Sequence, residues 1–209
     1  MRNQRVESAD DSLDRYYTPE WAIRALLEFI DVEGLTVSEP CAGRGDIVKP
    51  LLEAGTDGVI ASDIAPQRDI EFQGDATLPV HVPGGLPEAH LKSDIVITNP
   101  PYSADSGSAS EVITNLINEL DKPVWALLWL SGLEPTDSRY PLIESLSRLI
   151  ILPRVHFTGP AINKNSGCPG SCSAWFGWIP GEMDQPATVE VVSKRQKKRL
   201  KGQRSLLSE

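Results

Sequence analysis

The sequence has few cysteines and no long apolar run. Three cysteines in 209 residues are an odd, small count, which argues against a disulfide framework and for a reducing compartment. The longest apolar run, 124–130, has seven residues, whereas a membrane span needs roughly 18. The first 17 residues also lack the apolar stretch of a secretion signal. We therefore expect a cytoplasmic protein that does not span a membrane.

Charge is unevenly spread along the chain. Seven of the 20 basic residues lie between 194 and 204, while 28 of the 29 acidic residues precede this cluster. The cluster is either a solvated tail or an anchor for a nucleic-acid backbone or another polyanion, because local charge governs contact with phosphates. We expect a flexible N-terminus (1–14), one folded domain (15–182) and a basic C-terminal tail (183–209).

Helical and strand patterns alternate through the first 150 residues. Strands are predicted at 35–39, 58–62, 94–98, 124–130, 149–152 and 172–179, and helices from Pro19 on, after 46, at 110–120 and within 140–146. Such alternation predicts an α/β fold with a doubly wound, mostly parallel sheet. Loops at the carboxyl ends of its strands would form the ligand crevice.

The tetrapeptide Asn99-Pro100-Pro101-Tyr102 directly follows the buried strand predicted at 94–98. The two prolines confine the backbone, so the Asn99 side-chain oxygen and the Pro100 carbonyl can point at one small volume. A planar amino group would donate one hydrogen to each oxygen, and both would stabilise the positive charge that develops when the amine attacks an electrophile. Tyr102 offers a flat ring for stacking. An ordinary Asn-Pro turn with a core tyrosine is the alternative.

Three acidic residues precede this tetrapeptide, two of them at the ends of predicted strands. The turn at 39–46 (EPCAGRGD) lacks the third glycine of a dinucleotide site and the lysine of a P-loop, so it does not favour phosphate binding. Glu39 would instead attract an ammonium group, Asp63 would bind ribose hydroxyls, and Asp75 could accept from an adenine amine. S-adenosylmethionine, a cationic nucleoside without phosphates, fits this set, although each acid alone is also typical of a cap or turn.

These motifs together resemble the DNA methyltransferases that modify adenine at its N6 amino group. The resemblance covers residues 15–180 and is carried by Tyr17-Thr18-Pro19, Glu39-Pro-x-x-Gly43-x-Gly45-Asp46, Ser62-Asp63, Gly74-Asp75 and Asn99-Pro-Pro-Tyr102. It implies a Rossmann-like class I methyltransferase fold, S-adenosylmethionine as cofactor and duplex DNA with a flipped adenine as partner. The methyl group would pass directly to the amine, without a metal or a covalent enzyme intermediate.

The resemblance also implies a role for each matching residue. Cofactor binding would fall to Tyr17, Thr18, Glu39, Cys41, Ala42, Gly43, Gly45, Asp63, Asp75, Ala76 and Asn99. The catalytic group would be Asn99, Pro100, Pro101 and Tyr102, and the base would contact Tyr102 and Phe157. Cys168, Cys172 and His156 are spaced like metal ligands, but without an evident fourth ligand we expect no metal. Four tryptophans on predicted strands (125, 129, 175 and 178) are expected in the core, and His81 and His90 on the surface.

The chain departs from this family in the region that would read the DNA sequence. Only about 80 residues lie between the tetrapeptide and the basic tail, which leaves the loops at 103–110, 132–140 and 158–170 for target recognition. Weak specificity, a specificity subunit and a homo-oligomer all remain open. The alternative functions are methylation of an RNA base or a protein glutamine, and a non-catalytic nucleic-acid-binding subunit. Glutamine modifiers usually open the glycine turn with aspartate, so Glu39-Pro40 favours nucleic acid.

Overall fold

A computed structural model describes residues 16–67, 70–102, 109–137, 139–159 and 172–202. Within them lies a sheet of eight strands in the order β3-β2-β1-β4-β5-β7-β6-β8. The strands are β1 (Thr36–Glu39), β2 (Gly58–Asp63), β3 (Phe72–Gln73), β4 (Ile95–Thr98), β5 (Val124–Trp129), β6 (Arg148–Ile151), β7 (Ser173–Trp178) and β8 (Thr188–Val191). Only β7 runs antiparallel to its neighbours, so the prediction of a mostly parallel α/β sheet is confirmed.

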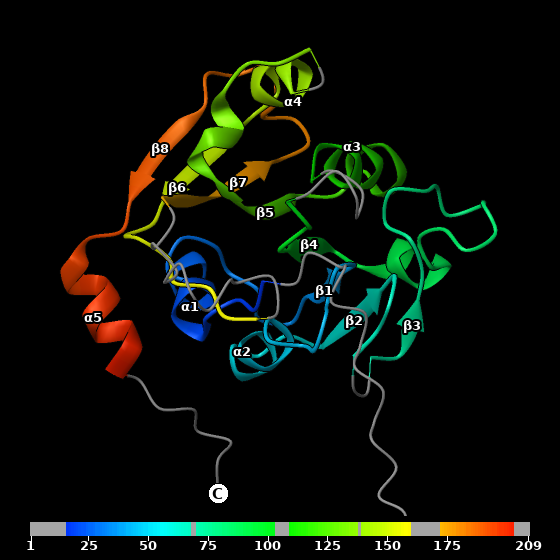
Figure 1. Cartoon of the computed structure of the whole chain (residues 1–209), viewed down its shortest axis with the longest axis horizontal. Helices are drawn as coiled ribbons and strands as arrows, with labels where there is room; N and C mark the ends of the chain where they lie inside the picture. The colour runs from blue at the N-terminus through cyan, green and yellow to red at the C-terminus, as the bar shows by residue number, and fades with distance from the viewer. Residues whose placement is uncertain (1–15, 68–69, 103–108, 138, 160–171, 203–209) are drawn as a thin grey trace, which may run out of the picture.

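Helices cover both faces of the sheet, as Figure 1 shows for α1 and α2 on one side and α3 on the other. The helices are α1 (Glu20–Leu26), α2 (Val48–Glu53), α3 (Ala109–Leu120), α4 (Tyr140–Glu144) and α5 (Lys194–Gly202), with 3-10 turns η1 (Glu88–Lys92) and η3 (Leu130–Leu133). Side chains alternate across each strand, so Ile95 and Ile97 join the core under α1 while Val96 joins the core under α3. None of the helices in the described ranges is long and apolar enough to cross a membrane.

The tryptophans expected in the core divide into two groups. Trp125, Trp175 and Trp178 are buried, as predicted. Trp129 lies at the end of β5 and is only half-buried. It stacks on Tyr102, which makes it part of the site described below.

His90, which the sequence placed on the surface, is fully buried between β1 and β2. Its ring nitrogens lie 2.6 Å from the Ser38 hydroxyl and 2.8 Å from the Ser62 hydroxyl. Burial lowers the pKa of His90 to about 4, so the ring is neutral and can donate to one serine while accepting from the other. Since Ser38 precedes Glu39 and Ser62 precedes Asp63, His90 joins the two strands directly behind their acidic ends.

The segment from 183 onward, predicted as a basic tail, contains regular structure through residue 202. Strand β8 pairs in parallel with β6, and Leu200 of α5 is buried in the core cluster that contains α1. A helical periodicity places this one apolar side chain on the inner face while most of the charged residues remain outside. The many charges in this segment therefore conceal a helix that packs on the domain.

Candidate active site

One pocket lies beside the carboxyl ends of β1, β2 and β4. Ten of the residues predicted from the sequence line it: Tyr17, Thr18, Cys41, Ala42, Gly43, Asp63, Asp75, Ala76, Asn99 and Pro101. Glu39, Gly45, Pro100, Tyr102 and Phe157 do not line this pocket. The parallel strands bring these distant positions together because their carboxyl ends share one edge of the sheet.

The glycine turn after β1 is fixed to the end of β2. Gly43 and Gly45 have φ angles of +54° and +85°, a region that favours glycine. This conformation lets the Gly43 N–H donate to one Asp63 carboxylate oxygen at 2.8 Å, while the Ala65 N–H donates to the other at 2.9 Å. Asp63 is thereby held at the pocket wall, where its oxygens can accept further hydrogen bonds.

Glu39 is a fully buried acid whose carboxylate lacks a cationic partner among the described residues. Its Oε1 accepts from the Thr98 hydroxyl at 2.8 Å and from the Cys41 N–H at 3.1 Å, but its Oε2 has no hydrogen-bond partner in the described chain. Desolvation raises the pKa of Glu39 to about 8, against the lowering effect of these two bonds. Such an atom in a folded protein needs an explanation, for example a catalytic role or a bound water, ion or ligand group.

Asp75 and Cys41 complete the predicted cofactor side. Asp75 Oδ1 accepts from the Thr77 N–H at 2.9 Å and from its hydroxyl at 2.7 Å. Burial, together with the nearby acids, raises the pKa of the Cys41 thiol, so this cysteine stays neutral and is not an activated nucleophile.

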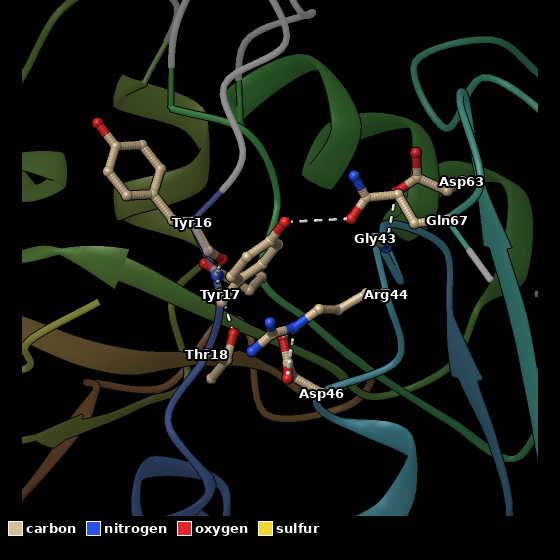
Figure 2. A network of polar contacts seen from close by, with 9 residues as sticks. Tyr16, Tyr17, Thr18, Gly43, Arg44, Asp46, Asp63 and Gln67 are labelled. Atoms are coloured by element: carbon tan, nitrogen blue, oxygen red, sulfur yellow. Dashed lines mark hydrogen bonds and ion pairs between the residues drawn. The ribbon is translucent and has the colours of Figure 1, made fainter. Parts of the chain in front are cut away.

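Sequence reasoning missed a group of polar contacts around Tyr17, shown in Figure 2. The Arg44 guanidinium lies 3.7 Å from the Tyr17 ring centroid and pairs with Asp46 at 2.8 Å. The Tyr17 hydroxyl donates to Gln67 Oε1 at 3.3 Å. Arg44 is the one basic residue among those lining the pocket. Its place inside the glycine turn could have drawn attention to it, whereas nothing in the sequence around Gln67 points to the site.

Asn99 is oriented by two hydrogen bonds from its amide nitrogen. Nδ2 donates to the Tyr16 carbonyl at 3.1 Å and to the Thr18 hydroxyl at 3.0 Å, which fixes Oδ1 on the opposite side of the amide. Thr18 does not cap α1, because Pro19 is the N-cap residue and no described side chain caps this helix. The Thr18 hydroxyl accepts from Asn99 instead.

The sequence led us to expect that the Asn99 side-chain oxygen would be free to accept from a substrate. In the structure this oxygen already has a hydrogen-bond partner. The Tyr102 hydroxyl lies 2.7 Å from Asn99 Oδ1 and 2.9 Å from the Leu127 carbonyl. One hydroxyl hydrogen has two acceptors within reach. It can therefore donate to Leu127 alone, which would release the Asn99 oxygen without leaving the hydroxyl unpaired.

The Tyr102 ring lies in a group of aromatic side chains that covers one of its faces. Trp129 stacks on it with ring centroids 4.5 Å apart, and Tyr16 contacts it edge-on at 5.4 Å. Phe157 lies 6.2 Å from Tyr102 and is only 3% exposed. The sequence led us to expect that the Tyr102 ring would be open for stacking, but Trp129 covers one of its faces. Sequence reasoning had assigned Trp129 to the core. The indole N–H of Trp129 is buried without an acceptor in the described ranges.

Several other predictions lie wholly or partly outside the described residues. Cys168 does so, as do most of the loops at 103–110 and 158–170 that were candidates for target recognition. Among the residues that are described, no three His, Cys, Asp or Glu side chains are grouped as metal ligands.

Comparisons with known proteins identify the fold. No protein-family model and no curated protein matches the sequence. A modification subunit assigned to a type I restriction enzyme of Vibrio vulnificus is 14% identical, with a TM-score of 0.55 over 90% of this chain and 49% of that chain. The methyltransferase subunit of a type I restriction-modification system from Streptococcus thermophilus is 13% identical, with a TM-score of 0.51 over 88% and 51%.

A third similar structure carries a different description. It is described as a hemolysin from Lactococcus lactis, and it is 12% identical with a TM-score of 0.53 over 87% of this chain and 94% of that one. By contrast, the chain spans only about half the length of the two restriction-modification subunits named above. The likeness concerns the fold: the chain shares the Rossmann-like α/β architecture of these methyltransferase subunits.

Proposed function

We propose that this protein is an S-adenosylmethionine-dependent methyltransferase that modifies the N6 amine of adenine in DNA. The observation that carries the proposal is Glu39, a buried acid with one oxygen that no described residue pairs, at the end of β1 beside a pocket that Asp63, Asp75 and Asn99 line. A ligand with an amino group, a ribose and a base, but no phosphate, is complementary to these residues.

The residues of the pocket fit the cofactor group by group. Glu39 would bind its ammonium group, and the positive charge would favour the ionised form of this carboxyl, whose pKa burial raises to about 8. Arg44 would pair with its carboxylate, because a guanidinium binds carboxylates through two parallel hydrogen bonds. Asp63 would accept from the ribose hydroxyls and Asp75 from the adenine amine.

The chain's own groups would hold and orient the substrate amine. The bound cofactor supplies an electrophilic methyl group. Asn99 Oδ1, released when the Tyr102 hydroxyl donates to Leu127, and the Pro100 carbonyl would each accept one hydrogen of the amine. Such orientation can contribute on the order of 7 to 11 kcal/mol to lowering the barrier.

Adenine in DNA is the substrate that the sequence motifs and the structural neighbours together favour. The turn opens with Glu39-Pro40, which is typical of the nucleic-acid enzymes, and two of the structural neighbours are restriction-modification subunits. A duplex adenine would leave its stack at a cost of a few kcal/mol, which contacts with the aromatic group around Tyr102 would offset. Because both neighbours are subunits of restriction systems, a further subunit that recognises the DNA sequence belongs to this proposal.

Transfer of a labelled methyl group tests the substrate class. The full chain is incubated with labelled S-adenosylmethionine and, in parallel, with duplex DNA, RNA and a protein extract, and the product is digested to identify the modified unit. Label on N6-methyladenine from DNA is the expected result. Label on an RNA base or a glutamine would replace the proposed substrate, and label in none of the three would favour a binding subunit.

The variant Asn99→Ala tests the mechanism. We expect methyl transfer to fall by at least about 100-fold, because an acceptor for the developing positive charge is lost, while cofactor affinity stays within about threefold. Asn118→Ala, an exposed asparagine on α3, is the matched control and should behave as the parent protein. Turnover that survives in Asn99→Ala would refute the role of this side chain.

A further inference from the structure

Helix α5 presents two different faces. Six of its nine residues are lysine or arginine. On the inner face, Leu200 is 3% exposed, the Lys197 ammonium lies 4.4 Å from the Trp21 ring centroid, and it also donates to the Arg154 carbonyl. Burial lowers the pKa of Lys197, and neighbouring Lys201 adds to the effect. These contacts hold α5 against α1, beside which it lies in Figure 1.

The outer face consists of Lys194, Arg195, Lys198 and Lys201, which we call the basic face. At 3.6 residues per turn these four side chains share one side of the helix, opposite Leu200. All four are exposed. They make no ion pair with the described part of the chain, whereas neighbouring Arg199 pairs with Glu28. The basic face is thus a row of hydrated cations on an otherwise acidic protein.

The sheet topology places the start of α5 at the edge of the sheet that carries the pocket. β4 and β5 are parallel, β6 and β5 each run antiparallel to β7, and β8 is parallel to β6. The carboxyl end of β8, from which the chain enters α5, therefore lies at the same edge as the carboxyl ends of β4 and β5.

Contacts bring α5 close to the aromatic group. Lys197 bonds to Arg154, three residues before Phe157, and an extended chain covers at most about 3.6 Å per residue. The Phe157 backbone is therefore within about 11 Å of the Arg154 backbone that Lys197 contacts. Since the Phe157 and Tyr102 ring centroids are 6.2 Å apart, a short stretch of chain links the residue that Lys197 contacts to the proposed base-binding residues.

We propose that the basic face of α5 binds the phosphate backbone of the duplex whose target base enters the site. Duplex DNA carries one charge per about 1.7 Å of its axis, so a nine-residue helix of about 13.5 Å faces several phosphates. Contacts of this kind position a protein on DNA without reading its sequence. This inference rests on the proposed function, and it supplies an anchor for DNA within a chain that has little room for a target-recognition region.

Salt-dependent binding of a fluorescent duplex to the full chain tests the inference. The variant Lys198→Gln/Lys201→Gln removes two charges from the basic face. The matched control Lys92→Gln/Lys122→Gln removes two lysines that precede β4 and β5, at the opposite edge of the sheet. Between about 50 and 200 mM salt, we expect the slope of log K against log salt to become shallower by about two units in the α5 variant, with binding about tenfold weaker. The control should keep the parent slope.

The possible outcomes separate this inference from the proposed function. A slope that the α5 variant leaves unchanged, or that the control lowers equally, overturns the inference even if methyl transfer to DNA is observed. A slope that falls only in the α5 variant supports it even if no transfer is found. Failure of the parent protein to bind the duplex overturns the inference. So does a parent protein that binds vesicles of anionic phospholipid more tightly than the duplex, if the α5 variant loses the vesicle binding. Thermal unfolding of both variants shows whether they remain folded.

Discussion

A single buried carboxyl, Glu39, links the site to the stability of the fold. Its pKa is 4.5 in an ordinary environment and about 8 in the folded protein. Between these two values the unfolded chain releases a proton that the folded chain keeps. Glu39 therefore favours folding fully below pH 4.5, and this contribution is lost as the pH rises to about 8.

Replacing Glu39 by glutamine should remove this pH dependence. In the parent protein, Glu39 should lower the free energy of unfolding by up to about 1.4 kcal/mol for each pH unit between pH 5 and about 8. In Glu39→Gln we expect this loss to be absent. We also expect S-adenosylmethionine to bind at least about tenfold more weakly, because the ammonium loses an ionic partner. Urea unfolding at several pH values and calorimetric titration measure the two effects. Glu88→Gln, an exposed glutamate, is the control, and an unchanged pH profile in Glu39→Gln would contradict the prediction.

Sequence reasoning brought most of the site residues together but did not predict their hydrogen bonds. Asn99, Asp63 and Asp75 line one pocket, as expected for residues that follow parallel strands. The bond between Tyr102 and Asn99 could not be predicted, because it depends on where β5 places the Leu127 carbonyl and the Trp129 ring. Spacing along the chain carries no information about partners that approach from another strand.

At the scale of elements, β7 depends on a close contact between a glycine and a tryptophan. Gly177 pairs with Trp125 on β5, and a Cβ added at Gly177 would lie 2.8 Å from the Trp125 ring. Trp125 is 1% exposed and cannot move aside easily. The antiparallel pairing of β7 with β5 therefore needs a residue without a side chain at this point.

The variant Gly177→Ala should lower stability by about 1 to 3 kcal/mol, the usual cost of overpacking a core. The matched control is Gly58→Ala at the start of β2, where an added Cβ meets no atom within 4 Å. That control should change the free energy of unfolding by less than about 1 kcal/mol. Chemical denaturation measures both variants, and equal effects would show that the contact with Trp125 does not limit the residue at 177.

Elements with strong patterns were predicted, and those with weak patterns were not. The apolar run of β5 and the amphipathic spacing of α3 are clear in the sequence because each buries several side chains. Strand β3 has only two residues, too few to show a pattern, and β8 alternates valine with polar residues but buries none of its four side chains. Helix α5 buries only Leu200 within a run of charges, and His90 gave no sign that two serines would enclose it.

At the scale of the whole molecule, a ligand that binds the folded protein in the pocket should raise its stability. A ligand at 100 times its Kd stabilises a folded protein by about 2.7 kcal/mol. For a chain of this size that corresponds to a rise in Tm of about 5 to 11 °C. We expect this rise with S-adenosylmethionine in a thermal unfolding experiment. ATP should give little or no shift, because its phosphates meet the acidic lining. An equal shift with ATP would contradict the proposed ligand chemistry.

The sequence by itself determined the class of the fold, the succession of its main strands along the chain and the polar residues that follow them, because hydrophobic period and turn chemistry are local properties. The tertiary structure decided which of these residues have partners. It buried Glu39 with one oxygen unpaired, directed the Tyr102 hydroxyl to both Asn99 and Leu127, and packed α5 on α1 with its basic face outward. Burial and pairing depend on atoms that come from distant parts of the chain, and only the folded arrangement of the strands brings those atoms within hydrogen-bonding distance.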